Sequence, residues 1–229
     1  MDSDSESCKA GGTSSKDILE PDVLLLSGQS VLSEASPLTS AYQINGDIRS
    51  ITKKHSSVVF ERVEGTAGTS QKQQLFYLAH PTNAQYRTDI PAKYYVTSVV
   101  PEMVGNIRLE VSKARFQKAS FKAILSPKKT AADELLFDEG AQHLLFDIQP
   151  NWKGSDCYKW TNFTAKQVAI EEKEDDRYKL SVTSMSQELR DALVATWLLR
   201  LWHDMAESRQ AKRECSLKLL LPSNPDSVC

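Results

Sequence analysis

The chain has 229 residues, of which 28 are Lys or Arg and 30 are Asp or Glu, so its formal net charge at pH 7 is −2. This length suits one domain with tails. The near-neutral balance excludes a dedicated polyanion-binding protein and a strongly acidic solvating chain, since both need a large excess of one charge. Any electrostatic partner must therefore bind to a local patch.

The first residues of the chain are acidic and rich in Ser and Gly, without the basic start and apolar stretch of a secretory signal. The four cysteines, Cys8, Cys157, Cys215 and Cys229, have no short spacing between any two. They form neither a disulfide framework nor a zinc-binding pattern. We therefore expect reduced thiols in an intracellular protein, cytoplasmic or nuclear, that carries no metal or cofactor.

Residues 1–37 are predicted to form an N-terminal tail that is disordered or loosely docked. The first 18 or so residues have too few apolar side chains to offset the entropy lost on ordering. The segment from Asp22 to Leu32 is apolar, but it lies between Pro21 and the sequence SEASP. We expect it to be a short edge strand or a docked arm.

From residue 38 the chain shows the alternation of period two that is typical of β-strands. Ile107, Leu109 and Val111 alternate with Arg108, Glu110 and Ser112, which predicts one buried and one solvated sheet face. Similar short runs recur along the chain and are separated by Gly, Asn, Asp and Pro clusters: 41–44, 57–63, 74–79, 93–100, 121–125, 144–148, 158–160, 168–170 and 178–182. Short strands at this spacing predict a mainly β domain, a sandwich or a barrel, over residues 38–213.

A helix is predicted over about residues 185–210, and it is apolar on nearly every side. One stripe at helical spacing runs from Leu189 to Met205, and Ala192–Leu199 fills much of the remaining circumference. Such a helix must be buried all round, yet it is too short to cross a bilayer, which takes roughly 20 apolar residues. Ser184 and Gln187 have the spacing of a capping box. The protein itself must therefore enclose this helix, and residues 214–229 are left as a C-terminal tail.

Antiparallel hairpins that end in one strongly apolar helix resemble the tubby C-terminal-like superfamily, which includes tubby-like, scramblase and LURP-one-related proteins, and its uncharacterised fungal members in particular. The resemblance rests on Asn151–Gly154, Tyr158–Trp160, Val168–Glu171, Tyr178–Val182 and Leu189–Trp202. It implies a closed antiparallel β-barrel around a central C-terminal helix. In that setting we expect Arg200 to reach a barrel mouth or to pair with an acidic group of the wall.

The strongest local charge asymmetry lies between residues 107 and 130, where the cations face only Glu110. The candidate binding face consists of Lys113, Arg115, Lys118, Lys122, Lys128 and Lys129, next to Arg108. The resemblance implies that such a face could bind phosphoinositide or other anionic lipid head groups at a membrane periphery. The same residues can equally be a solvated face that the acidic segment after residue 132 complements.

Several function classes remain open at this point. The chain has no HExxH, GxSxG, GxxxxGK[ST] or GxGxxG motif and no calcium-binding EF-hand loop, so we predict a non-enzymatic binding or scaffold protein that recognises an anionic phospholipid or an acidic protein surface. Nucleic-acid binding or transcriptional regulation is the alternative, but only Phe116 and Phe121 could stack on bases, and Phe121 is predicted to face inward. An enzyme whose site is not visible as a motif is the third possibility.

Overall fold

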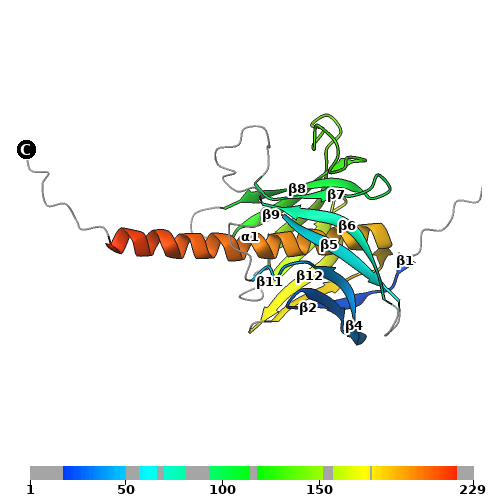
Figure 1. Cartoon of the computed structure of the whole chain (residues 1–229), viewed down its shortest axis with the longest axis horizontal. Coiled ribbons are helices and arrows are strands. Elements are labelled where there is room, and N and C mark those ends of the chain that lie inside the picture. Colours follow the sequence, from blue (N-terminus) through cyan, green and yellow to red (C-terminus); the bar gives the residue numbers. More distant parts are fainter. Residues whose placement is uncertain are drawn as a thin grey trace, which may run out of the picture.

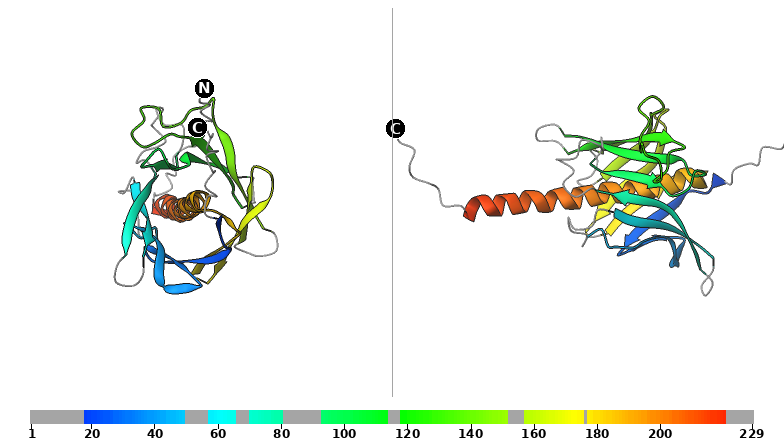
Figure 2. Two further views of the ribbon diagram at one scale, coloured as in Figure 1. Left: turned by 90° about the vertical axis from the view of Figure 1, so that its right-hand side faces the viewer. Right: turned by 45° about the horizontal axis from the view of Figure 1, so that its top comes forward.

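The computed structural model describes residues 18–49, 57–65, 70–80, 93–113, 118–151, 157–175 and 177–220, and from residue 207 it describes the backbone alone. These residues form a closed antiparallel β-barrel of twelve strands with one helix inside it (Figures 1 and 2). The fold class predicted from the sequence is therefore confirmed.

The strands follow one another around the barrel mostly in chain order. The barrel strands are β2 (Asp22–Ser27), β3 (Ser30–Ser33), β4 (Ser36–Ile44), β5 (Ser57–Glu64), β6 (Gln71–Ala79), β7 (Tyr95–Ser98), β8 (Gly105–Ser112), β9 (Ser120–Pro127), β10 (His143–Pro150), β11 (Cys157–Asn162), β12 (Gln167–Glu174) and β13 (Arg177–Val182). The barrel closes where β13 pairs with β2, with Leu180 opposite Leu24. A separate two-stranded sheet joins β1 (Ile18–Leu19) to β14 (Met185–Ser186).

The barrel begins earlier in the chain than the predicted boundary at residue 38. β2 and β3 lie within the segment assigned to a loose tail, yet they are wall strands paired on both sides. Leu24, Leu26 and Val31 point inward and are at most 4% exposed. Pro21 does not interrupt this arrangement because it precedes the first residue of β2. Residues 1–17, for which disorder was predicted, lie outside the described residues.

The helix α1 (Gln187–Leu220) starts later and ends later than the predicted range of 185–210. Met185 and Ser186 form β14, so Ser184 lies three residues before the first helical residue and the predicted capping box does not mark the helix start. The segment after Met205 is rich in Ala, Glu, Lys, Arg and Leu, which favour helix. α1 therefore continues into the predicted tail of residues 214–229, of which 221–229 lie outside the described part of the chain.

The helix is longer than the barrel that surrounds it. Its 34 residues extend over about 51 Å, whereas an eight-residue wall strand spans about 26 Å. Figure 1 shows α1 entering at the end near β1 and emerging from the opposite end. The two ends of the barrel are called the entry mouth, where Gln187 lies, and the exit mouth, toward which the helix runs.

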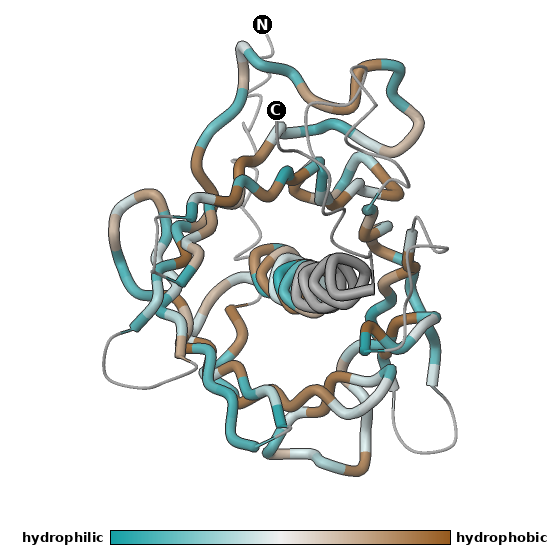
Figure 3. Tube along the Cα trace, turned by 90° about the vertical axis from the view of Figure 1, so that its left-hand side faces the viewer, coloured by the Kyte–Doolittle hydropathy of each residue, from teal (hydrophilic) through white to brown (hydrophobic). Residues whose placement is uncertain are grey.

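The core lies between α1 and the barrel wall. Every residue from Ala192 to Trp202 is at most 2% exposed, as a helix that is apolar all round requires. Figure 3 shows α1 surrounded by the ring of strands. A barrel of twelve strands is wider than a bare helix, so large side chains are needed to fill the space between them. The largest of them are fully buried: Phe60, Phe76, Phe121, Phe146, Trp160, Trp197 and Trp202.

The loop after β9 is fixed to the wall by a buried amide. The Asn106 side chain donates hydrogen bonds to the carbonyls of Thr130 and Leu136, at 3.0 and 2.9 Å, and its oxygen accepts one from the Ser98 backbone at 2.8 Å. Next to it, Gly105 has a φ of 123°, and a Cβ there would lie 2.3 Å from the Ser126 carbonyl oxygen. The position of Lys128 and Lys129 at this end of β9 is therefore well defined.

Candidate functional site

The first polar cluster inside the barrel lies at the entry mouth and centres on Asp191. This carboxylate accepts hydrogen bonds from Arg62 Nη1 at 2.7 Å, Gln187 Nε2 at 2.6 Å and the Tyr42 hydroxyl at 3.0 Å. The Asp191 side chain is only 1% exposed. Arg62 also contacts Glu64 at 2.8 Å and Gln73 at 2.6 Å, so its guanidinium is fully engaged. The cluster joins β4, β5 and β6 to the first turns of α1.

Burial raises the pKa values of both acidic groups in this cluster. Burial, with the Asp191 carboxylate beside it, raises the pKa of the Tyr42 hydroxyl well above its ordinary value. Burial also raises the pKa of Asp191, although Arg62, Gln187 and Tyr42 act in the opposite direction. Tyr42 therefore serves as a hydrogen-bond donor rather than as a base.

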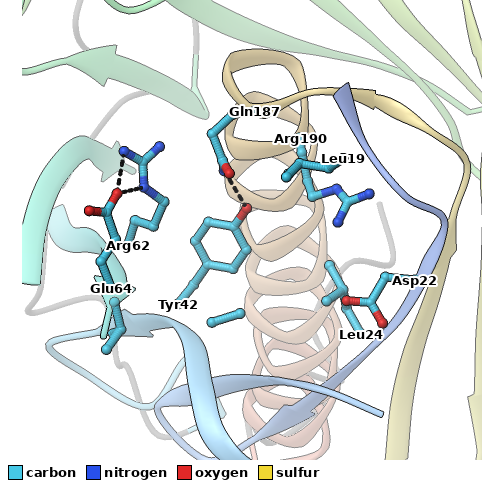
Figure 4. Close-up of a pocket in the computed structure, with 10 residues that line it drawn as sticks. Leu19, Asp22, Leu24, Tyr42, Arg62, Glu64, Gln187 and Arg190 are labelled. Carbon is cyan, nitrogen blue, oxygen red and sulfur yellow. Dashed lines mark hydrogen bonds and ion pairs between the residues drawn. The ribbon is translucent and has the colours of Figure 1, made fainter. Parts of the chain in front are cut away.

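A cavity of about 240 Å³ opens beside the Asp191 cluster (Figure 4). It lies between β2, β4, β5 and the first turn of α1. Its walls combine apolar and charged groups: Leu19, Asp22, Leu24, Ala41, Tyr42, Arg62, Val63, Glu64, Gln187 and Arg190. Among the described residues, those that line this cavity include carboxylates and arginines but no histidine.

The second polar cluster lies toward the exit mouth and centres on Arg200. Its guanidinium forms a buried ion pair with Glu171 of β12 and a second one with Asp204 at 2.7 Å. It also lies over the ring of Tyr158, 4.3 Å from the centroid. Trp160 Nε1 donates to Glu171 at 3.4 Å. The expectation that Arg200 pairs with an acidic group of the wall is confirmed.

Charge and burial oppose one another in this second cluster. Burial raises the pKa of Glu171, although Arg200 favours its ionised form. Burial disfavours the charged Arg200 guanidinium, but Glu171 and Asp204 outweigh that effect and raise its pKa. These groups hold the helix and the wall together, because Arg200 of α1 pairs with Glu171 of the wall.

The candidate basic residues are spread along the outside of the barrel rather than gathered in one patch. Lys113 follows β8 and Lys118 precedes β9, whereas Lys128 and Lys129 follow the opposite end of β9. Ten residues of extended chain between Lys118 and Lys128 correspond to about 33 Å. Arg115 lies outside the described residues.

Acidic neighbours accompany several of these cations. Arg108 pairs with Glu110 at 2.9 Å, and Lys129 approaches Asp133 to 3.9 Å. Lys122 lies between two carboxylates in the sheet, because Glu110 is its register partner on β8 and Asp147 its partner on β10. Lys113, Lys118, Lys122 and Lys128 are exposed. The middle of β9 therefore presents Lys122 among alternating charges, and the other exposed lysines lie toward the two ends of the strand.

Aromatic side chains do not add a base-stacking surface to this segment. Phe121 is 1% exposed and packs inward against Tyr158, as predicted, and Phe116 lies outside the described residues. Two histidines, His80 and His203, instead pack against Tyr94 near the exit mouth, with ring centroids 4.2 and 4.9 Å from it. Within the described ranges, no group of three or more His, Cys, Asp or Glu side chains could hold a metal ion.

Sequence reasoning did not identify the Asp191 cluster or the cavity beside it. Tyr42, Arg62 and Asp191 are far apart in the chain, and only the barrel register brings them together. A signal was present nonetheless. Asp191 lies beside a helical segment that must be buried all round, and a buried carboxylate needs a cation or several donors.

No family model, curated protein or solved structure matches this chain. Among the residues described, no helix combines the length and the apolar character needed to cross a membrane. The functional proposals below therefore rest on the chain's own residues.

Proposed function

We propose that this protein is a non-enzymatic binding or scaffold protein that meets its partners with the outer surface and the two mouths of the barrel. The observation that carries this proposal is the filled interior. The α1 segment from Ala192 to Trp202 is at most 2% exposed, so the part of the lumen around this segment has no room for a substrate, and the cavity at the entry mouth lies before it. The superfamily resemblance agrees with this reading, because a helix enclosed by a barrel is what it implies.

The partner that best suits the exposed lysines is an anionic surface, such as a phospholipid leaflet or an acidic protein face. Each Lys near an anionic membrane contributes about 1 kcal/mol of attraction. Because the lysines lie at two ends of β9, we expect one end to dominate rather than the whole strand. Lys113 and Lys118 form one candidate pair, and Lys128 and Lys129 form the other.

Co-sedimentation with vesicles tests this proposal. The vesicles would contain phosphatidylcholine alone, phosphatidylcholine with phosphatidylserine, or phosphatidylcholine with a phosphoinositide. We compare wild type with the variants Lys113→Glu/Lys118→Glu and Lys128→Glu/Lys129→Glu. Losing two lysines removes about 2 kcal/mol of attraction, so the variant at the responsible end should bind at least about 30-fold more weakly.

A matched control carries the same change of charge elsewhere on the barrel. Lys72 on β6 and Lys166 in the turn between β11 and β12 are exposed, and Lys72→Glu/Lys166→Glu should bind like wild type. Equal loss in all three variants would indicate a general charge effect. Equal binding by wild type and both β9 variants would contradict the lipid proposal, and a pull-down with an acidic protein would then test the other partner class.

A further inference from the structure

One cation at the entry mouth has no anionic partner among the described residues. Arg190, in the first turn of α1, is only 7% exposed. Within the described part of the chain, its one hydrogen bond goes to the backbone carbonyl of Glu20, and no carboxylate lies within ion-pair distance of it. Its buried Nε has no hydrogen-bond partner among the described residues, but Arg200 Nε has none either. What distinguishes Arg190 is the missing carboxylate, because Arg62 and Arg200 both have carboxylate partners.

A buried guanidinium in this position weakens the fold unless something else compensates it. Inside proteins a guanidinium keeps its charge, so it needs a compensating group more than a buried lysine does. The place of Arg190 in the first helical turn adds to the cost, because the positive end of the helix dipole repels a cation. An apolar side chain would suit the fold better, which points to a ligand that supplies the missing negative charge.

The same cavity also presents a carboxylate without a cation. Asp22 of β2 lines the cavity with Arg190. It accepts hydrogen bonds from the Val23 backbone at 2.7 Å and the Ser33 hydroxyl at 2.9 Å, and it forms no ion pair among the residues described. In Figure 4, Arg190 reaches from α1 toward the N-terminal segment that carries Asp22. The cavity therefore offers one uncompensated charge of each sign.

The charges around the cavity select the kind of ligand. A simple anion would meet Arg190 but would also face the carboxylate of Asp22, while the charge of Arg62 in the same wall is already paired with Glu64 and Asp191. A neutral molecule with both charges avoids this repulsion. The volume of about 240 Å³ is below the range of roughly 300 to 1,000 Å³ that is usual for drug-sized ligands. It corresponds to about eight water molecules at roughly 30 Å³ each, which is enough for a small zwitterion.

We propose that this cavity binds a small zwitterion of amino-acid size, whose carboxylate pairs with Arg190 and whose ammonium pairs with Asp22. The side chains of Leu19, Leu24 and Val63 would contact its carbon atoms. Arg62, Tyr42 and Gln187 hold one wall in place, because the Asp191 cluster already satisfies them. This site is independent of the proposed lipid-binding lysines.

Isothermal titration of the full chain with L-alanine tests this proposal, with acetate, ethylammonium and inorganic phosphate as single-charge probes. Alanine should bind, and each single-charge probe should bind at least tenfold more weakly. Equal or tighter binding of acetate or phosphate would overturn the zwitterion assignment. The absence of a response to alanine and to a panel of other small amino acids would overturn the site.

Two variants distinguish an effect on ligand binding from an effect on the stability of the fold. Arg190→Met and Asp22→Asn should each weaken alanine binding at least tenfold, whereas the exposed control Lys128→Met should not change it. Arg190→Met should also melt at the same temperature as the unliganded wild type or at a higher one, since it removes an uncompensated buried charge. A clearly lower melting temperature would mean that Glu20 already satisfies Arg190, and that would contradict the proposal. Vesicle binding should be unchanged in both variants.

Discussion

The two ends of the enclosed segment of α1, at Asp191 and Arg200, each form an ion pair with the wall, and the signs of the partners are opposite. At the entry mouth the helix supplies the carboxylate, Asp191, and the wall supplies the guanidinium of Arg62. Toward the exit mouth the helix supplies the guanidinium, Arg200, and the wall supplies the carboxylate of Glu171. Between them the helix is almost entirely apolar. Because the two ion pairs have opposite signs, they specify which end of the helix lies at which mouth of the barrel. The apolar surface alone does not specify this orientation.

A helix inserted the other way round would bring like charges together. Asp191 would approach Glu171, and Arg200 would approach Arg62. Like charges at a buried contact disfavour an alternative arrangement strongly, so the two pairs act against reversed insertion. An apolar helix fits a barrel in many rotations and depths, and the buried charges select one of them.

The largest effect is expected in the apolar middle, where neither charged end contributes. Trp197→Ala should lower the free energy of unfolding by about 3–5 kcal/mol, because the fully buried indole leaves a cavity that the barrel cannot close. Urea denaturation followed by circular dichroism measures this. Leu38→Ala is the control, since Leu38 is 99% exposed, and it should change stability by less than about 0.5 kcal/mol. A small effect of Trp197→Ala would indicate that the helix is loosely held.

The Arg200–Glu171 pair toward the exit mouth can be tested by removing one of its charges and then both. Glu171→Leu should cost about 3 kcal/mol, since it leaves Arg200 buried with Asp204 as its remaining carboxylate partner. The double variant Glu171→Leu/Arg200→Met should recover most of this loss, because it removes both charges. Urea denaturation of the four proteins of this cycle gives the coupling energy. If the double variant is no more stable than Glu171→Leu, the ion pair is not the source of the cost.

The sequence predicts the enclosing barrel because a few patterns have only one physical outcome. A short helical segment with Leu193, Val194 and Leu199 on different sides must be surrounded, and strands such as 107–111 supply a wall with one apolar face. Ile107 and Leu109 are indeed buried, although Val111, near the end of β8, is 40% exposed. These predictions depend only on the spacing of apolar residues within one segment of the chain.

The features that were not predicted depend on pairings between distant segments. The sequence of β2 alone is compatible with an edge strand or with a strand of the barrel wall. It is a wall strand because it pairs with β13, which lies about 150 residues later in the chain. In the same way, the cavity and the Asp191 cluster exist only because Tyr42, Arg62 and Asp191 meet in one register. An acidic partner for Arg200 could be expected, but not that Glu171 would be that partner.

Breaking the Arg62–Asp191 pair at the entry mouth should cost less stability than breaking the Arg200–Glu171 pair toward the exit mouth. Arg62→Met leaves Asp191 with two donors, Tyr42 and Gln187, so we expect a loss of about 1–3 kcal/mol rather than a larger one. The same denaturation experiment compares it with Glu171→Leu. A greater loss in Arg62→Met would mean that the entry-mouth pair contributes more to holding the helix than the exit-mouth pair does.

The smallest effect is a dependence of stability on pH that originates at Asp191. Its pKa is raised by burial, so between the ordinary aspartate value of about 3.9 and the higher folded value, the folded state holds a proton that the unfolded state has lost. By linkage, this contribution is fully present below pH 3.9 and is lost as the pH rises through the folded pKa. Asn at this position does not titrate, so the stability of wild type relative to Asp191→Asn should fall across this range.

Asp133→Asn provides a control with the opposite sign. Hydrogen bonds from the Thr130 backbone and hydroxyl lower the pKa of Asp133, so its contribution is present above the ordinary aspartate value and is lost as the pH falls through the folded pKa. Urea denaturation of the three proteins from acidic to neutral pH measures both slopes. If wild type gains stability over Asp191→Asn as the pH rises, the ionised form of Asp191 is the favoured one, and Arg62 outweighs burial at the entry mouth.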